Sequence, residues 1–193
     1  MRLSTTLLAL TLVASVPARA GTIGITYTFS GVGTVTGMSG GFLDLTGAAT
    51  GSVDQWNPAV NAVWNPVTYD DMGQLNLSTG LSNGTFTMTF ANGDILSGTV
   101  FENQTMVNTS TVMGPITQTL TFTAGTGEFA GVSGTSSGAG FVTPAGFTDS
   151  GSGTLTAPGL VAPEPASIAL VFGGVLLIAL RYRPQTQFSR NSR

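Results

Sequence analysis

Residues 22–30 read TIGITYTFS, and this stretch decides the fold class. Large apolar side chains occupy every second position, at Ile23, Ile25, Tyr27 and Phe29, and small or hydroxylated residues stand between them. A period of two matches a strand whose successive side chains point to opposite faces of a sheet. The stretch therefore predicts a half-buried strand of an antiparallel sheet.

The same alternation recurs twice further along the chain. Residues 85–90 alternate threonine with Phe86, Met88 and Phe90. Residues 116–124 place threonines between apolar positions, namely Ile116, Leu120 and Phe122. Since no stretch between the two ends has the period of a long amphipathic helix, the sequence predicts an all-β domain.

Turn signals and glycine-rich segments complete this prediction. Asn83-Gly84, Asn92-Gly93-Asp94 and the segment 125–128 are typical of turns between strands. Segments 133–140 and 150–156 are rich in glycine and serine, and the apolar residues near them favour a last hairpin over a flexible linker. The strand spacing suits an antiparallel barrel or, as an alternative, a two-sheet sandwich.

The charge distribution excludes several classes of function. All six basic residues are arginines in the two terminal segments, whereas residues 21–162 carry eight acidic residues and no basic one. Nucleic-acid binding relies on Lys and Arg and is therefore not expected. The chain has no cysteine and no histidine, which removes thiol catalysis and the usual imidazole base.

The first twenty residues resemble an export signal in their order of parts. Arg2 precedes an apolar run over residues 7–16, and Ala18-Arg19-Ala20 forms an Ala-x-Ala cleavage site. We therefore predict a signal peptide that is cut after Ala20 and export through the Sec translocon. A buried N-terminal element is the alternative.

The other end of the chain carries a short apolar segment before a basic tail. Residues 166–180 are uncharged and apolar on all sides, and Arg181 and Arg183 follow at once. At ~1.5 Å per residue the segment is shorter than the roughly 30 Å apolar layer of a bilayer, so a buried core helix competes with a transmembrane helix. The missing polar face and the flanking arginines favour the membrane.

The residues ahead of this segment match a known pattern. Pro163, Glu164, Pro165, Ala166 and Ser167, followed by the apolar segment and the arginines, resemble the PEP-CTERM sorting signal of Gram-negative bacteria. The resemblance implies processing by a membrane protease of the exosortase class and a link to exopolysaccharide. It implies no catalytic residue.

Together these features predict five segments. They are a signal peptide (1–20), a β-domain (21–157), a spacer (158–165), a transmembrane helix (166–180) and a basic cytoplasmic tail (181–193). We expect an exported protein, anchored briefly in the inner membrane and then placed at the cell surface or outside the cell. The expected role is structural or adhesive in an envelope, exopolysaccharide or biofilm matrix. We expect neither an enzyme nor a cofactor.

A second resemblance concerns the body of the chain. The run 123–134, with its glycines around Glu128-Phe129, is similar to a strand–turn–strand motif of secreted bacterial barrels that resemble allene oxide cyclase and dirigent proteins. The similarity covers residues 93–156. It implies a barrel rather than a sandwich and brings no activity with it.

Two Trp-Asn-Pro triplets suggest a ligand contact. Trp56 and Trp64 lie eight residues apart in a segment that prolines make irregular, and Tyr69 follows. Exposed indoles at the mouth of a barrel would stack on sugar rings, which favours a glycan- or small-molecule-binding module as the alternative function. Burial of the tryptophans as a plug is the other interpretation.

The acidic residues offer two further hypotheses. A glycosidase needs two carboxylates, and Glu102 with Asp94 or Glu128 is a candidate pair. Asp70 and Asp71 are candidate calcium ligands, although no recognised loop spacing surrounds them, and we expect no metal site. The simpler expectation places most of the acids in solvated turns: Asp70, Asp71, Asp94, Glu128 and Asp149.

Overall fold

The protein folds into a β-barrel. In the computed structural model, the described residues are 21–55, 63–105 and 113–160. They include eight strands and a short 3-10 helix, η1 (Gly127–Phe129). The strands are β1 (Gly21–Ser39), β2 (Phe42–Gln55), β3 (Val67–Asn76), β4 (Leu81–Thr89), β5 (Ile95–Gln104), β6 (Gly114–Gly125), β7 (Ser133–Thr143) and β8 (Gly146–Ala157).

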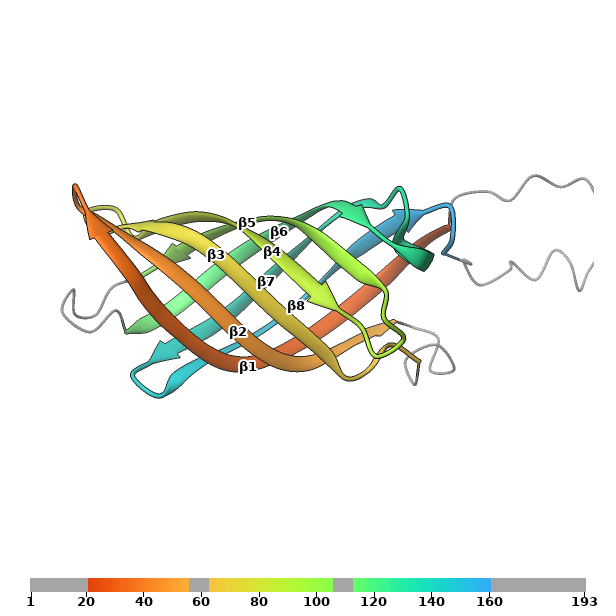
Figure 1. Cartoon of the computed structure of the whole chain (residues 1–193), viewed down its shortest axis with the longest axis horizontal. Coiled ribbons are helices and arrows are strands. Elements are labelled where there is room, and N and C mark those ends of the chain that lie inside the picture. Colours follow the sequence, from red (N-terminus) through yellow and green to blue (C-terminus); the bar gives the residue numbers. More distant parts are fainter. Residues whose placement is uncertain (1–20, 56–62, 106–112, 161–193) are drawn as a thin grey trace, which may run out of the picture. The chain divides into compact units, whose positions relative to one another are not determined.

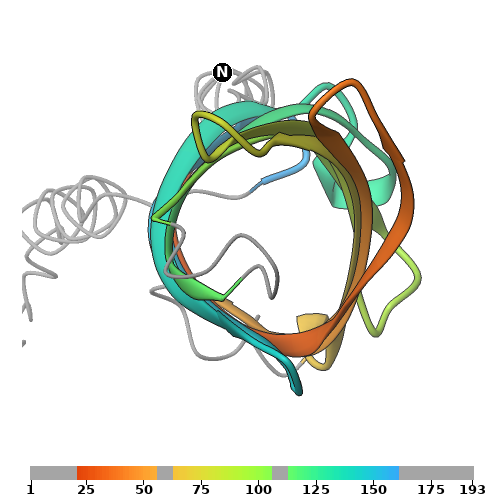
Figure 2. The ribbon, with the colours of Figure 1, turned by 90° about the vertical axis from the view of Figure 1, so that its left-hand side faces the viewer.

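The strands pair in chain order, each antiparallel to the next, and β8 pairs with β1 to close the sheet. Figure 1 shows the barrel from the side, and Figure 2 shows the ring of strands along its axis. Closure leaves few unpaired strand edges. The predictions of an all-β domain and of a barrel are therefore confirmed, and the sandwich alternative is wrong.

The apolar side chains of β1 fill part of the barrel interior. Ile23, Ile25, Tyr27 and Phe29 are buried, and the threonines between them are exposed. The apolar positions predicted in residues 85–90 and 116–124 are buried in the same way, at Phe86, Met88, Phe90, Ile116, Leu120 and Phe122. The segments rich in glycine and serine form the last hairpin, β7–β8.

One predicted turn is wrong. Asn83-Gly84 lies inside β4, where Asn83 pairs with Gln74 on one side and Phe101 on the other. A Cβ added at Gly84 would collide with the carbonyl oxygen of Met72, so glycine allows the close approach of two strands here. The turn lies earlier, where the Asn76 side chain accepts the N–H of Ser78 at 2.9 Å.

The other predicted turns are confirmed, and they meet at one end of the barrel. Asn92-Gly93-Asp94 connects β4 to β5, and residues 125–128 lead from β6 into η1. The Asp94 carboxylate accepts the N–H of Glu128 at 3.1 Å. A Cβ at Gly127, whose φ is +56°, would collide with the same carboxylate.

Aromatic side chains seal this end, which we call the capped end. Trp64 lies 5.5 Å from Phe90 and 5.1 Å from Phe129 between ring centroids, and Phe90 and Phe129 are 4.6 Å apart. Each such pair adds ~0.5–1.5 kcal/mol to the gain from burial. The three rings close the barrel interior on this side.

The opposite end, which we call the open end, carries the β1–β2, β3–β4 and β7–β8 turns (Figure 1). Here β1 separates from β8 after the pair Gly31–Phe147, whereas its pairing with β2 continues to Ser39 and Phe42. The β1–β2 hairpin therefore extends beyond the closed part of the barrel.

No helix within residues 21–55, 63–105 and 113–160 is long and apolar enough to cross a bilayer. The predicted signal peptide with Ala18 and Ala20, the transmembrane segment 166–180 and the basic tail lie outside the described residues. Pro163, Glu164, Pro165, Ala166, Ser167, Arg181 and Arg183 lie outside them as well. The sorting assignments therefore stay predictions.

Candidate functional site: a cavity with inward-facing carboxyl groups

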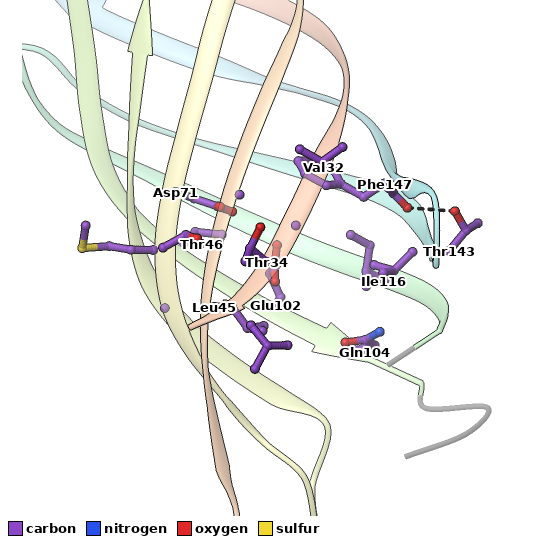
Figure 3. A pocket seen from close by; sticks show the side chains of 18 of the residues that line it. Val32, Thr34, Leu45, Thr46, Asp71, Glu102, Gln104, Ile116, Thr143 and Phe147 are labelled. Atoms are coloured by element: carbon purple, nitrogen blue, oxygen red, sulfur yellow. Dashed lines mark hydrogen bonds between the residues drawn. The ribbon is translucent and has the colours of Figure 1, made fainter. Parts of the chain in front are cut away.

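A cavity of about 350 Å³ lies at the open end of the barrel (Figure 3). Ligand pockets in proteins span roughly 300–1,000 Å³, so the volume suits a small molecule. Its walls are largely apolar and come from several strands, with contributions from Val35, Leu45, Val100, Ile116, Val142 and Phe147.

Glycines at inward-facing positions leave this space free. Gly33, Gly47 and Gly73 line the cavity on three consecutive strands. A Cβ added at Gly47 would collide with the carboxylate of Asp71, so the glycine makes room for that side chain. Further along the barrel, Gly138 and Gly151 make the same kind of room for the phenol oxygen of Tyr27.

Two carboxyl groups line the cavity, and a third lies close to them. Asp71 on β3 and Glu102 on β5 are lining residues. Asp149 on β8 is 6% exposed and interacts electrostatically with Glu102. Strand alternation turns all three inward, since they share a face with the buried residues Tyr69, Val100 and Leu155.

Burial changes the acidity of these groups. It raises the pKa of Glu102 to about 7, and the negative charges of Asp71 and Asp149 add to the rise. Burial also raises the pKa of Asp149 to about 7 and raises the pKa of Asp71. Glu102 and Asp149 therefore change protonation near neutral pH, where ordinary surface acids are fully ionised.

Two buried tyrosines accompany the carboxyl groups. The Tyr69 hydroxyl donates to Oδ2 of Asp71 at 3.3 Å, and the Gln118 side-chain amide donates to the Tyr27 hydroxyl oxygen at 3.0 Å. Burial and the nearby carboxylates raise the pKa of both phenols well above the usual value. The tyrosines stay neutral at physiological pH.

Among the described residues, three side-chain polar atoms are buried without a hydrogen-bond partner. They are Nε2 of Gln104, a residue that is 7% exposed and lines the cavity, Oδ1 of Asp149 and Oγ of Ser136. Glu102 makes no hydrogen bond through its carboxyl group to any residue of the described ranges. Buried polar groups in proteins are nearly always hydrogen-bonded, so unpaired atoms on the polar side of this cavity are unusual.

Three aromatic residues, Trp56, Trp64 and Tyr69, are predicted by the sequence to contact a ligand. Trp56 lies outside the described residues. Trp64 is fully buried at the capped end, and its indole N–H donates to Glu128 at 3.2 Å. Its position corrects the expectation of an exposed indole at the barrel mouth and matches the plug interpretation, because Phe90 and Phe129 cover the ring. Tyr69 is inside the barrel, beside Asp71.

The candidate carboxylate pairs need a correction too. Asp94 and Glu128 lie together at the capped end, whereas Glu102 lies at the open end with Asp71 and Asp149 as acidic neighbours. The proposed pairs of Glu102 with Asp94 or Glu128 are therefore wrong.

Asp70 and Asp71 do not form a joint calcium site. Both belong to β3, where neighbouring side chains point to opposite faces, so Asp70 is exposed and Asp71 faces the interior. Nowhere in the described part of the chain do three acidic residues group closely enough to hold a metal ion.

The turn assignment of the acids is also wrong for three of them. Asp70 and Asp71 lie in β3, and Asp149 lies in β8. One signal for Asp71 was present in the sequence: continuing the period of two from Val67 through Tyr69 puts Asp71 on the buried face.

Comparison with known proteins gives a structural likeness but no match of sequence. No protein-family model matches the chain, and no curated protein matches its sequence. Its structure is similar to that of a pterocarpan synthase dirigent protein, with a TM-score of 0.44 and 15% sequence identity over 72% of this chain and 89% of that one. The barrel itself is established by the strand pairing of this chain.

Proposed function

We propose that the protein is a binding module that holds a small amphipathic molecule in the open end of its barrel. The observation that carries this proposal is the cavity of about 350 Å³, which has largely apolar walls and two half-buried, inward-facing carboxyl groups. Apolar pockets with a few converging polar groups are the usual form of small-molecule sites. The absence of catalytic activity stays a prediction from the sequence.

The geometry favours binding at the open end over binding at the tryptophans. The capped end is filled by Trp64, Phe90 and Phe129, each of which is at most 3% exposed. The open end instead has glycines where side chains would otherwise fill the interior. A ligand with an apolar body gains ~25 cal/mol for each Å² of apolar surface that it buries there.

Filling the cavity tests this proposal. We expect Ile116→Trp to weaken binding of prodan, a neutral dye whose emission reports an apolar environment, at least ten-fold, because the indole occupies the space that the dye needs. Thr117→Trp is the matched control, since it adds the same ring to the exposed face of the same strand. Equal binding by the wild type and both variants would contradict the proposal.

The place of action is a separate proposal, supported by the sequence of the two ends. We propose that the barrel is exported and sorted through its PEP-CTERM-like end, with an exosortase-type protease and a membrane as partners. A structural or adhesive role with exopolysaccharide would use the same location. If a chain ending at Leu160 stays in the inner-membrane fraction as fully as the whole chain, the sorting proposal fails.

A further inference from the structure

The carboxyl groups at the cavity have no basic side chain to pair with among the described residues. All six basic residues of the chain are Arg2, Arg19, Arg181, Arg183, Arg190 and Arg193, so the described ranges contain none. A buried carboxylate is costly unless a positive group or hydrogen-bond donors compensate it. Asp71 accepts hydrogen bonds from the Tyr69 hydroxyl and the Gly47 backbone, and Asp149 accepts one from the Ser150 backbone. No described residue donates a hydrogen bond to the Glu102 carboxyl group, so a proton or an entering molecule would have to compensate its charge.

An independent observation points to an entering molecule. Gln104 is 7% exposed, lines the cavity, and leaves its Nε2 without a partner. It is two residues from Glu102 on β5, so both side chains face the same cavity from the same strand (Figure 3). A ligand in this place would meet a carboxyl group and an amide that no described residue engages.

The surroundings of Glu102 indicate the charge of that ligand. The titratable groups that face it are Asp71 and Tyr69 from β3, Asp149 from β8 and Tyr27 from β1. Every one of them is negative or neutral. A cation at Glu102 is therefore attracted from several sides, and an anion is repelled from the same sides.

We propose that the cavity selects an amphipathic amine, whose ammonium group lies at Glu102 and Asp71 and whose apolar body packs against Val100 and Ile116. This inference rests on the proposed binding function and names its ligand class. Gln104 would donate to an oxygen acceptor on the same ligand where one is present. A bare metal ion fits less well, because the carboxyl groups of the described residues do not come together as a metal-holding group.

The proposal predicts that binding of an amine is coupled to release of protons, so that the affinity depends on pH. Burial and mutual repulsion raise the pKa of Glu102 to about 7, and a bound ammonium group would lower it again. The protein therefore releases protons when it binds an amine at pH 6–7. Affinity for an amine should rise between pH 5 and pH 8, whereas affinity for a neutral alcohol should change little or fall.

A matched series of ligands tests the proposal. Octylamine, octanol and octanoate share their apolar chain and differ in the charge of the head group, and each competes with prodan on the purified protein. At pH 8 we expect octylamine to displace prodan at a concentration at least ten-fold lower than octanol, and octanoate to be the weakest. At pH 5 the advantage of octylamine should shrink to about three-fold or less.

Two variants test whether Glu102 causes the preference for octylamine over octanol. Glu102→Gln should remove most of the advantage of octylamine at pH 8 and leave octanol unchanged. Asp70→Asn removes the same charge from the outer face of β3 and should preserve the advantage. Circular dichroism establishes that both variants are folded, and the pH series on the wild-type protein needs no variant.

The outcomes separate the two proposals. Equal displacement by octylamine and octanol at pH 8 would overturn the amine inference and leave the binding function in place. An advantage of octylamine that is unchanged in Glu102→Gln or independent of pH would overturn it as well. If prodan does not enter the cavity, as judged by Ile116→Trp, the binding function fails and the amine inference fails with it.

Discussion

The side-chain amide of Gln118 donates a hydrogen bond of 3.0 Å to the hydroxyl oxygen of Tyr27, although the two residues are 91 positions apart in the chain. Both side chains are buried, with exposed fractions of 5% and 2%. The bond joins β1 to β6 across the interior of the barrel. It shows that the middle of the barrel is a partly polar core, set between the aromatic cap and the open cavity.

Removing the acceptor of this bond should destabilise the barrel. In Tyr27→Phe the Gln118 amide stays buried without its partner, which costs about 1–3 kcal/mol of unfolding free energy. Urea denaturation followed by circular dichroism measures the loss. The double variant Tyr27→Phe/Gln118→Met should recover part of it, because the buried amide that lost its partner is then removed. A double variant less stable than Tyr27→Phe would contradict this explanation.

The glycine at position 151, beside the Tyr27 side chain, should be needed for full stability of the barrel. A Cβ at Gly151 would collide with the Tyr27 hydroxyl oxygen, so Gly151→Ala should cost about 1–3 kcal/mol through overpacking. Gly33→Ala is the control, since the nearest atom to an added Cβ there is the Thr46 carbonyl oxygen at 4.0 Å. Thermal melts should show a clear fall in Tm for the first variant only, and similar falls for both would count against the close contact.

The aromatic cap should contribute strongly to stability. Phe129 is fully buried against Trp64 and Phe90, so Phe129→Ala should lower the unfolding free energy by about 3–5 kcal/mol. Phe101→Ala truncates the same side chain at a position that is 44% exposed, and its effect should stay within about 0.5 kcal/mol. Denaturant titrations of the two variants compare them directly, and a small loss for Phe129→Ala would argue against a packed cap.

Stability should fall as the pH rises toward neutral. In the unfolded chain Glu102 and Asp149 have ordinary pKa values of 4.5 and 3.8, and in the fold burial raises both to about 7. Between these values the native state binds more protons than the unfolded state, so the unfolding free energy decreases with rising pH. At about 1.36 kcal/mol per pKa unit, we expect the unfolding free energy to decrease by roughly 3 kcal/mol between pH 4.5 and pH 8 through Asp149 alone, and to decrease further through Glu102.

Two variants check the source of this dependence. Glu102→Gln, which stays neutral, should flatten the pH profile of stability, whereas Asp70→Asn on the outer face should leave the profile as steep as in the wild type. Denaturation curves at intervals between pH 4.5 and pH 8 give both profiles. A wild-type profile that rises with pH over this range would have the opposite sign from the one that buried acids require.

Local patterns were sufficient to predict the barrel wall from the sequence. The alternation at Ile23, Ile25, Tyr27 and Phe29 identifies the buried face of β1, because strand geometry alone determines which side chains share a face. Where the pattern competed with turn chemistry, the prediction failed. Asn83-Gly84 has the composition of a turn, but pairing with strands on both sides keeps it in β4.

The cavity could not be predicted in the same way. It depends on which strands become neighbours after closure. Closure brings Glu102 within electrostatic reach of Asp71 and Asp149, which come from separate segments of the chain. An acidic residue in a polar segment is normally solvated, so the sequence favoured turns for Asp70, Asp71 and Asp149. The continued alternation from Val67 was the one local clue to the inward position of Asp71.

Site-resolved NMR of methyl groups during a titration with prodan tests the central claim most directly. The account predicts that the methyl signals of Val100 and Ile116, which line the cavity, shift with saturation, while those of Val53 and Leu155, which are buried outside its lining, stay in place. Unchanged signals at Val100 and Ile116 when the dye is bound would contradict the assignment of the open end as the binding site.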